Sequence, residues 1–202
     1  MAKKLLRWGM IGTGNVTELK SAPSFTKIED SRLMAVANRS PEKAEDYAHR
    51  HGIPAWHRDP YEVIRDPEVD MVYVATPPGS HADYALECIR AGKPVYLEKP
   101  MARTWEECQI INEAARTAGV PVFVAYYRRA QQPFLKIKSL LDEGAIGQPR
   151  LVNIMPVMVE ENLVSPAVST IPQMATRPVK ASATSSNGFL NIASPLRQPL
   201  IY

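Results

Sequence analysis

The chain has 202 residues, of which 45% are hydrophobic and 22% are charged, and its formal net charge is +3. This length can bury one full core and part of a second, and this composition excludes a largely disordered chain and gives no sign of a dedicated nucleic-acid binder. No segment is apolar for long enough to act as a signal peptide or to span a membrane. We therefore expect a cytoplasmic protein without nucleic-acid or membrane partners, in which Cys88 and Cys108 are reduced thiols.

Apolar runs and amphipathic patterns alternate along most of the chain. In order, the patterns predict a strand at 5–12, a strand at 33–38, a helix at 40–52, a short helix from 59 to 66, a strand at 70–76, a helix at 80–92, a strand at 94–97, a helix at 104–119, a strand at 120–126 and a helix at 133–144. Such alternation is typical of parallel βα units. We expect an α/β fold with a Rossmann-type, doubly wound parallel sheet over residues 1–128.

The first predicted strand runs into the loop GTGNVT, where Gly12, Gly14 and Thr17 occupy the three positions of the dinucleotide fingerprint. The first glycine permits a tight turn, and the second lets the backbone approach a pyrophosphate at the N-terminus of the next helix. Thr17 replaces the third glycine, which slightly loosens helix–strand packing without blocking the phosphate. A glycine-rich turn without a ligand is the alternative. We expect nucleotide binding by Gly12, Thr13, Gly14, Asn15 and Val16.

The end of the second predicted strand bears on the choice between NADP and NAD. Rossmann domains that use NAD carry an Asp or Glu here, which accepts a hydrogen bond from the ribose 2′-hydroxyl. This chain has the neutral Asn38, followed by Arg39, whose planar cation suits a phosphate, and by Ser40 at a helix start. We expect these three residues to bind the cofactor and to favour NADP, with NAD as the other choice. The alternative is that Arg39 is a solvated loop residue.

Unusual residues follow the later strands, at the edge where ligands collect in a doubly wound sheet. Four of them follow the strand at 70–76 or sit at its end, namely Thr76, Pro77, Pro78 and His81, and two follow the strand at 94–97, namely Glu98 and Lys99. Arg128 follows the strand at 120–126. A lysine at such a place can hold a hydroxyl or carbonyl oxygen while hydride moves to or from its carbon. An ordinary surface loop is an equally good interpretation of these residue types alone.

Four segments together resemble the Gfo/Idh/MocA oxidoreductases, which include glucose-fructose oxidoreductase and inositol dehydrogenase. They are GMIGTGNVT, AVANRSPEKAE, VYVATPPGSHADYALECIRAGKPVYLEKPMA and FVAYYRR. The resemblance implies NAD or NADP as cofactor, a sugar, inositol or related polyol as substrate, and a homo-oligomer for full-length relatives. It also implies that Lys99 contacts the reacting oxygen beside the nicotinamide and that Glu98 orients it.

The resemblance ends near Met155. We expect residues 129–158 to form the helix and first strand of an incomplete α+β substrate domain, and residues 159–202 to be an irregular tail, as in a truncated member of the family. The chain has four histidines, His49, His51, His57 and His81, and none can be assigned the family's proton-transfer role or a metal site. A nucleotide-binding module without turnover, or a partner of a full-length relative, is therefore the alternative to an active dehydrogenase.

Overall fold

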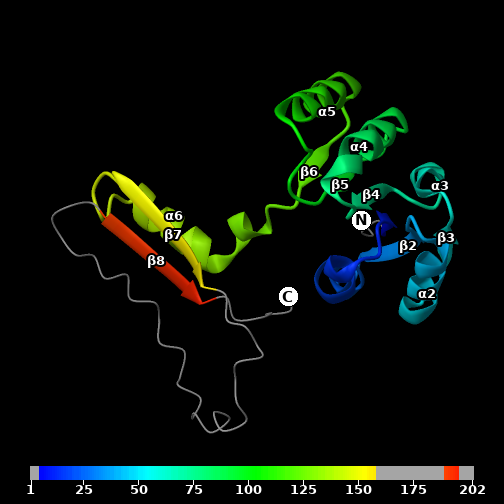
Figure 1. The fold of residues 1–202 in the computed structure, drawn as a ribbon, viewed down its shortest axis with the longest axis horizontal. Helices are drawn as coiled ribbons and strands as arrows, with labels where there is room; N and C mark the ends of the chain where they lie inside the picture. The colour runs from blue at the N-terminus through cyan, green and yellow to red at the C-terminus, as the bar shows by residue number, and fades with distance from the viewer. Residues whose placement is uncertain (1–4, 158–188, 196–202) are drawn as a thin grey trace, which may run out of the picture. The chain divides into compact units, whose positions relative to one another are not determined.

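The computed structural model describes residues 5–157 and 189–195 (Figure 1). These residues belong to two compact units, one ending at Tyr126 and the other beginning at Tyr127. Each unit is described by itself below.

The first unit is built on one parallel sheet of six strands in the order β3-β2-β1-β4-β5-β6. The strands are β1 (Leu6–Ile11), β2 (Ser31–Ala37), β3 (Ala55–His57), β4 (Met71–Val74), β5 (Val95–Leu97) and β6 (Val122–Val124). This is the strand order of a dinucleotide-binding Rossmann domain, with the crossover between β1 and β4. The expected doubly wound parallel sheet is confirmed.

Helices cover both faces of this sheet. They are η1 (Thr17–Ser21), α1 (Ala22–Lys27), α2 (Pro41–His51), α3 (Pro60–Arg65), η2 (Pro78–Ser80), α4 (His81–Arg90) and α5 (Trp105–Ala118). One buried cluster joins the sheet to α3, α4 and α5 through Ile64, Cys88 and Ile111. A second cluster joins the opposite face to α1 and α2 through Phe25 and Tyr47. The sheet is therefore buried on both sides, which explains its unbroken apolar strands.

Local sequence signals account for most element ends. Gly52 and Gly119 adopt the left-handed conformation, with φ of 62° and 66°, and end α2 and α5. Thr104 accepts a hydrogen bond from the backbone of Glu107 and caps α5. Ser80, which precedes α4, makes no such capping bond, because its hydroxyl donates to Thr76 Oγ1 at 2.8 Å.

Strand β3 was not predicted. Its three residues, Ala55–His57, are too few to show a period, and they form a strand because they pair with Ala35–Ala37 of β2. It is an edge strand of the sheet. Only long-range pairing identifies it, so the sequence around Trp56 carries no local signal.

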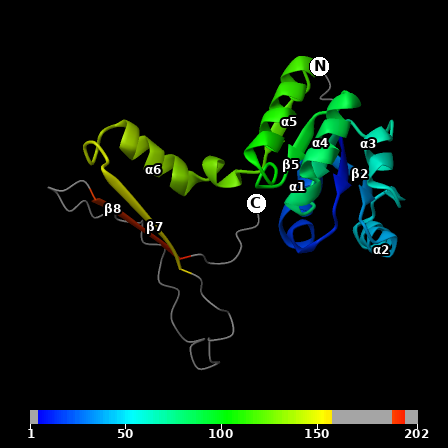
Figure 2. The same cartoon turned by 45° about the horizontal axis from the view of Figure 1, so that its top comes forward.

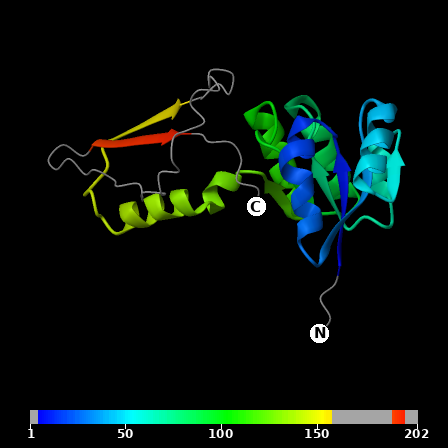
Figure 3. The ribbon, with the colours of Figure 1, turned by 90° about the horizontal axis from the view of Figure 1, so that it is seen from below.

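The second unit contains η3 (Tyr127–Ala130), α6 (Gln132–Asp142), β7 (Leu151–Val157) and β8 (Phe189–Pro195). β7 and β8 pair in parallel, from Leu151 opposite Phe189 to Val157 opposite Pro195, and they lie side by side in Figures 1, 2 and 3. Strand β8 falls in the segment expected to be irregular, and its short apolar run was missed because its partner lies far away in the sequence. The rest of that expected tail, residues 159–188 and 196–202, lies outside the described residues.

Candidate functional site

The loop after β1 turns so sharply at Gly12 that only glycine fits. The φ angle of Gly12 is +103°, and a Cβ atom there would lie 2.7 Å from the carbonyl oxygen of Ala75. The backbone N–H of Gly12 donates to Ala37 at 2.8 Å. This one residue therefore holds the end of β1 against the residues that follow β4 and those that end β2.

The surroundings of Gly14, unlike those of Gly12, are open. A Cβ atom there would meet no atom within 4 Å, and Gly14, Asn15 and Val16 are exposed. Helical backbone begins at Asn15, and the first N–H groups of a helix have no acceptor within the helix. Thr17, in the third fingerprint position, is fully buried and donates from Oγ1 to the carbonyl of Gly14 at 2.7 Å. The loop thus has the room and the donors that a pyrophosphate needs.

Asn38 connects this loop to the start of α2. Its amide Nδ2 donates to Oγ1 of Thr13 at 2.7 Å, and its Oδ1 accepts from the backbone N–H of Ser40 at 3.0 Å. The guanidinium of Arg39 is exposed. The hydroxyl of Ser40, expected to face a cofactor phosphate, donates to Oε2 of Glu42 at 2.9 Å.

His81 joins the loops that follow β4 and β5. Its ring is fully buried, with Nε2 2.8 Å from the carbonyl oxygen of Thr76 and Nδ1 2.9 Å from that of Pro100. Pro77 has an extended backbone, with φ −60° and ψ 147°, and Pro78 begins η2. Because both ring nitrogens of His81 face backbone oxygens, the histidine contributes to the site through the two loops that it connects.

Glu98 follows β5 directly and is half-buried. Its Oε1 accepts a hydrogen bond of 2.8 Å from the hydroxyl of Tyr73, and its Oε2 accepts one of 3.2 Å from the backbone N–H of Lys99. Burial, together with the nearby Glu98 charge, raises the pKa of Tyr73. Glu98 therefore holds the backbone N–H of Lys99, whose side chain is exposed.

The contacts bring the strand-end residues of the first unit to one edge. Ala75 donates to Ile11 at 2.8 Å, and Glu98 donates from its backbone to Val74 at 2.9 Å. Because all six strands are parallel, their carboxyl ends share this edge. Arg128 lies on η3 in the second unit, where it lines a hollow of about 250 Å³ with Arg129, Phe134, Leu135 and Lys138.

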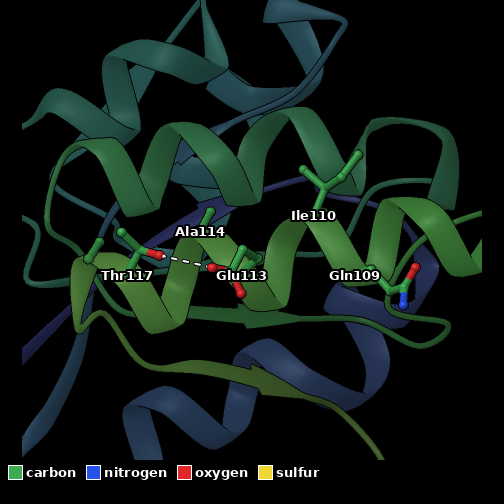
Figure 4. Close-up of a pocket in the computed structure, with 6 residues that line it drawn as sticks. Gln109, Ile110, Glu113, Ala114 and Thr117 are labelled. Carbon is green, nitrogen blue, oxygen red and sulfur yellow. Dashed lines mark hydrogen bonds between the residues drawn. The ribbon is translucent and has the colours of Figure 1, made fainter.

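A second hollow, of about 590 Å³, lies on the surface of α5 (Figure 4). All its lining residues come from that one helix, and Thr117 in it donates to Glu113 at 3.4 Å. None of the predicted site residues lines it.

Among the described residues, no three His, Cys, Asp or Glu side chains are placed to hold a metal ion. No helix in that part of the chain is long and apolar enough to cross a bilayer.

Comparison with known proteins identifies the family to which this Rossmann unit belongs. Residues 6–126 match the oxidoreductase family with an NAD-binding Rossmann fold, Gfo/Idh/MocA. The chain belongs to this family. The resemblance drawn from the four sequence segments is thereby confirmed, and the match covers more than half of the chain.

Three relatives illustrate the breadth of the Gfo/Idh/MocA family. An oxidoreductase P35 of Formosa agariphila is 48% identical over 142 residues, which are 70% of this chain and 44% of the relative. The scyllo-inositol 2-dehydrogenase (NAD(+)) of Bacillus subtilis is 31% identical over 144 residues, 71% of this chain and 42% of the relative. The structure of a 3-ketoreductase variant from Actinomadura kijaniata, in complex with NADP, is 25% identical with a TM-score of 0.65, covering 72% of this chain and 46% of the other. The chain thus spans less than half the length of each.

Sequence reasoning missed Tyr73 as a residue that contacts the candidate site, through its bond to Glu98. The segment that contains it reads as a continuous apolar strand, and Tyr73 is indeed fully buried. A buried phenol almost always has a hydrogen-bond partner, so the tyrosine was itself a signal that a polar group lies against β4. Glu42 was missed as well, because its contact with Ser40 lies within what looked like an ordinary helix start.

Proposed function

We propose that the chain binds NAD or NADP along the carboxyl edge of its sheet and transfers hydride between the nicotinamide and a sugar, inositol or related polyol. The observation that carries this proposal is the combination, on one edge, of the Gly12–Gly14 loop and of Lys99, held by Glu98. The names of the relatives support the substrate class, since one is an inositol dehydrogenase and another a ketoreductase.

The residues of this chain have distinct roles in the proposal. The cofactor, when bound, supplies or accepts the hydride. The N–H groups at Asn15 and Val16 and the open space at Gly14 hold its pyrophosphate. The ammonium of Lys99 donates to the substrate oxygen and stabilises the negative charge that builds on it as hydride leaves or reaches the carbon. Glu98 positions that lysine through its backbone.

The proposed cofactor preference is NADP, with NAD also bound. Asn38 is neutral, so it offers no carboxylate to a ribose 2′-hydroxyl. Both polar ends of its amide already form hydrogen bonds, to Thr13 and to Ser40. Arg39 is exposed and forms no ion pair within the part of the chain that the structure describes. Its permanently charged fork suits a 2′-phosphate. Titration of nicotinamide fluorescence with NADPH and NADH tests this preference: tighter NADPH binding that is lost in Arg39→Ala supports it, and equal or tighter NADH binding contradicts it.

A nucleotide-binding module without turnover is the second candidate, and the histidines favour it. His81 is buried between two carbonyl groups, His51 contacts Glu18 at 2.9 Å, and His57 contacts Asp66 at 3.2 Å. These three histidines thus make structural contacts within the protein. Turnover of inositols or sugars with bound NAD(P) separates the candidates: reduction of the cofactor supports the dehydrogenase, and binding without reduction supports the module.

The last part of the proposal concerns the cellular location and the oligomeric state of the protein. Cys88 and Cys108 are both free thiols, which agrees with a cytoplasmic protein. The resemblance to the family implies a homo-oligomer for full-length relatives, and light scattering of the purified chain at two concentrations measures the oligomeric state of this chain.

A further inference from the structure

The start of α2, where the proposed function puts the 2′-phosphate of NADP, holds an anion of its own. Oε2 of Glu42 lies 2.9 Å from the hydroxyl of Ser40. The pKa of the Glu42 carboxyl is lowered by its own backbone N–H, by that hydroxyl and by the charge of Arg58. The carboxylate therefore accepts a hydrogen bond from a hydroxyl at the beginning of the helix, and this is a donor that suits a phosphate oxygen equally well.

Two cations and one anion surround this part of the proposed cofactor site. Arg39 follows β2 and Arg58 follows β3, so both lie at the carboxyl edge of neighbouring strands, and both are exposed. Glu42 is exposed too. A phosphate group close to Ser40 would be attracted by the two guanidinium groups and repelled by the carboxylate, whereas a ribose hydroxyl carries no charge and would feel neither force strongly.

We infer that Glu42 sets the cofactor preference of this chain by competing with the 2′-phosphate of NADP for Ser40 and the start of α2. The inference rests on the proposed function, since it assigns a specificity-determining residue to the same nucleotide site. Glu42 weakens the binding of NADP and leaves the binding of NAD almost unchanged. The chain thereby retains NAD as a second cofactor although Arg39 favours NADP.

The test is the substitution Glu42→Gln, which keeps the size of the side chain and removes its charge. NADPH should bind roughly three- to tenfold more tightly to the variant, as expected for the loss of one nearby charge repelling a phosphate in a partly solvated site. NADH affinity should change less than about twofold on the same argument. The gain for NADPH should shrink at high salt, which screens interactions between exposed charges.

A matched control separates this effect from a change in net charge. Glu29 is exposed and lies just before β2, at the opposite edge of the sheet. Glu29→Gln makes the same charge change there, and it should alter neither affinity. Displacement of bound NADPH by adenosine 2′,5′-bisphosphate and by 5′-AMP locates the effect: only the first carries a 2′-phosphate, and only the first should gain affinity in Glu42→Gln.

The outcomes distinguish this inference from the proposed function. If the unaltered chain binds both dinucleotides and Glu42→Gln leaves their ratio unchanged, the inference is overturned and the proposed function stands. If Glu42→Gln strengthens NADPH and NADH equally, Glu42 acts as a general charge and the inference is again overturned. If the unaltered chain binds neither dinucleotide, the proposed function fails and the inference fails with it.

Discussion

The hydroxyl of Tyr73 on β4 donates a hydrogen bond of 2.8 Å to the carboxylate of Glu98, which directly follows β5. Glu98 in turn accepts the backbone N–H of Lys99. A buried residue of the core therefore determines where the proposed catalytic lysine leaves the sheet.

Removing that hydroxyl should destabilise the protein. Tyr73→Phe deprives a half-buried carboxylate of one donor, and we expect a loss of about 1.5–3 kcal/mol in the free energy of unfolding, the usual range for a hydrogen bond to a charged group. Urea denaturation measures it. Tyr96→Phe is the control, because Tyr96 packs against Tyr73 with ring centroids 5.5 Å apart but is only half-buried. An equal loss in both variants would mean that the bond to Glu98 contributes nothing.

The same tyrosine should make the protein sensitive to alkali. Its pKa in the folded state is raised by burial above the ordinary value of 10. A raised pKa of this kind contributes stability that is fully present below the unfolded value of about 10 and is lost as pH rises from there toward the folded value. Stability measured from pH 9 upward should therefore fall, and it should fall less steeply in Tyr73→Phe. Parallel curves for the two proteins would contradict the prediction.

The two fingerprint glycines should respond differently to substitution. Gly12→Ala forces a Cβ atom against the Ala75 carbonyl and keeps a left-handed backbone, so it should cost roughly 1–3 kcal/mol or more of stability. Gly14→Ala places its Cβ atom in open space, so the melting temperature should move by no more than a few degrees, about as much as a surface substitution.

Nucleotide binding separates these two glycines further. Gly14→Ala should weaken NADPH and NADH by roughly tenfold or more, because the side chain fills the space through which the backbone approaches a pyrophosphate. Thermal unfolding and nicotinamide fluorescence on the same samples give both quantities. Unchanged binding in Gly14→Ala would place the pyrophosphate elsewhere.

Substitution of Lys99 should affect chemistry and spare binding. If the protein turns over a polyol, Lys99→Ala should lower the rate by roughly a hundredfold or more, as expected for a group that acts on the reacting oxygen. Cofactor affinity should barely change, since the side chain is exposed and the backbone of residue 99 keeps its bond to Glu98. A variant that no longer binds NADPH, or that keeps its full rate, would refute the role assigned to Lys99.

Much of the first unit could be predicted from local patterns. The five longer apolar runs became strands, and the glycines at 52 and 119 end helices because a left-handed residue is needed there. Strand β3 and the contacts of Ser80 could not be predicted, because each depends on a partner brought close only by folding. The same holds for the site: the glycines and Lys99 stand out in the sequence, whereas the engagement of His81 by Thr76 and Pro100 requires the folded chain.

The double engagement of Asn38 has a consequence for redesigning cofactor use. Its amide holds Thr13 in the phosphate-binding loop and the backbone of Ser40 at the same time. Replacing it by aspartate, the direct way to install an acceptor for the ribose 2′-hydroxyl, would remove the only donor of that side chain. The bond to Thr13 would then form only if the threonine hydroxyl donated to the new carboxylate, and that would occupy an oxygen of the carboxylate. A substitution at residue 38 that changes the choice between NAD and NADP therefore also changes a contact of the loop proposed to bind the pyrophosphate. Exchanges at positions 39 and 42, which leave the amide in place, can shift the choice between the two dinucleotides without loosening that loop.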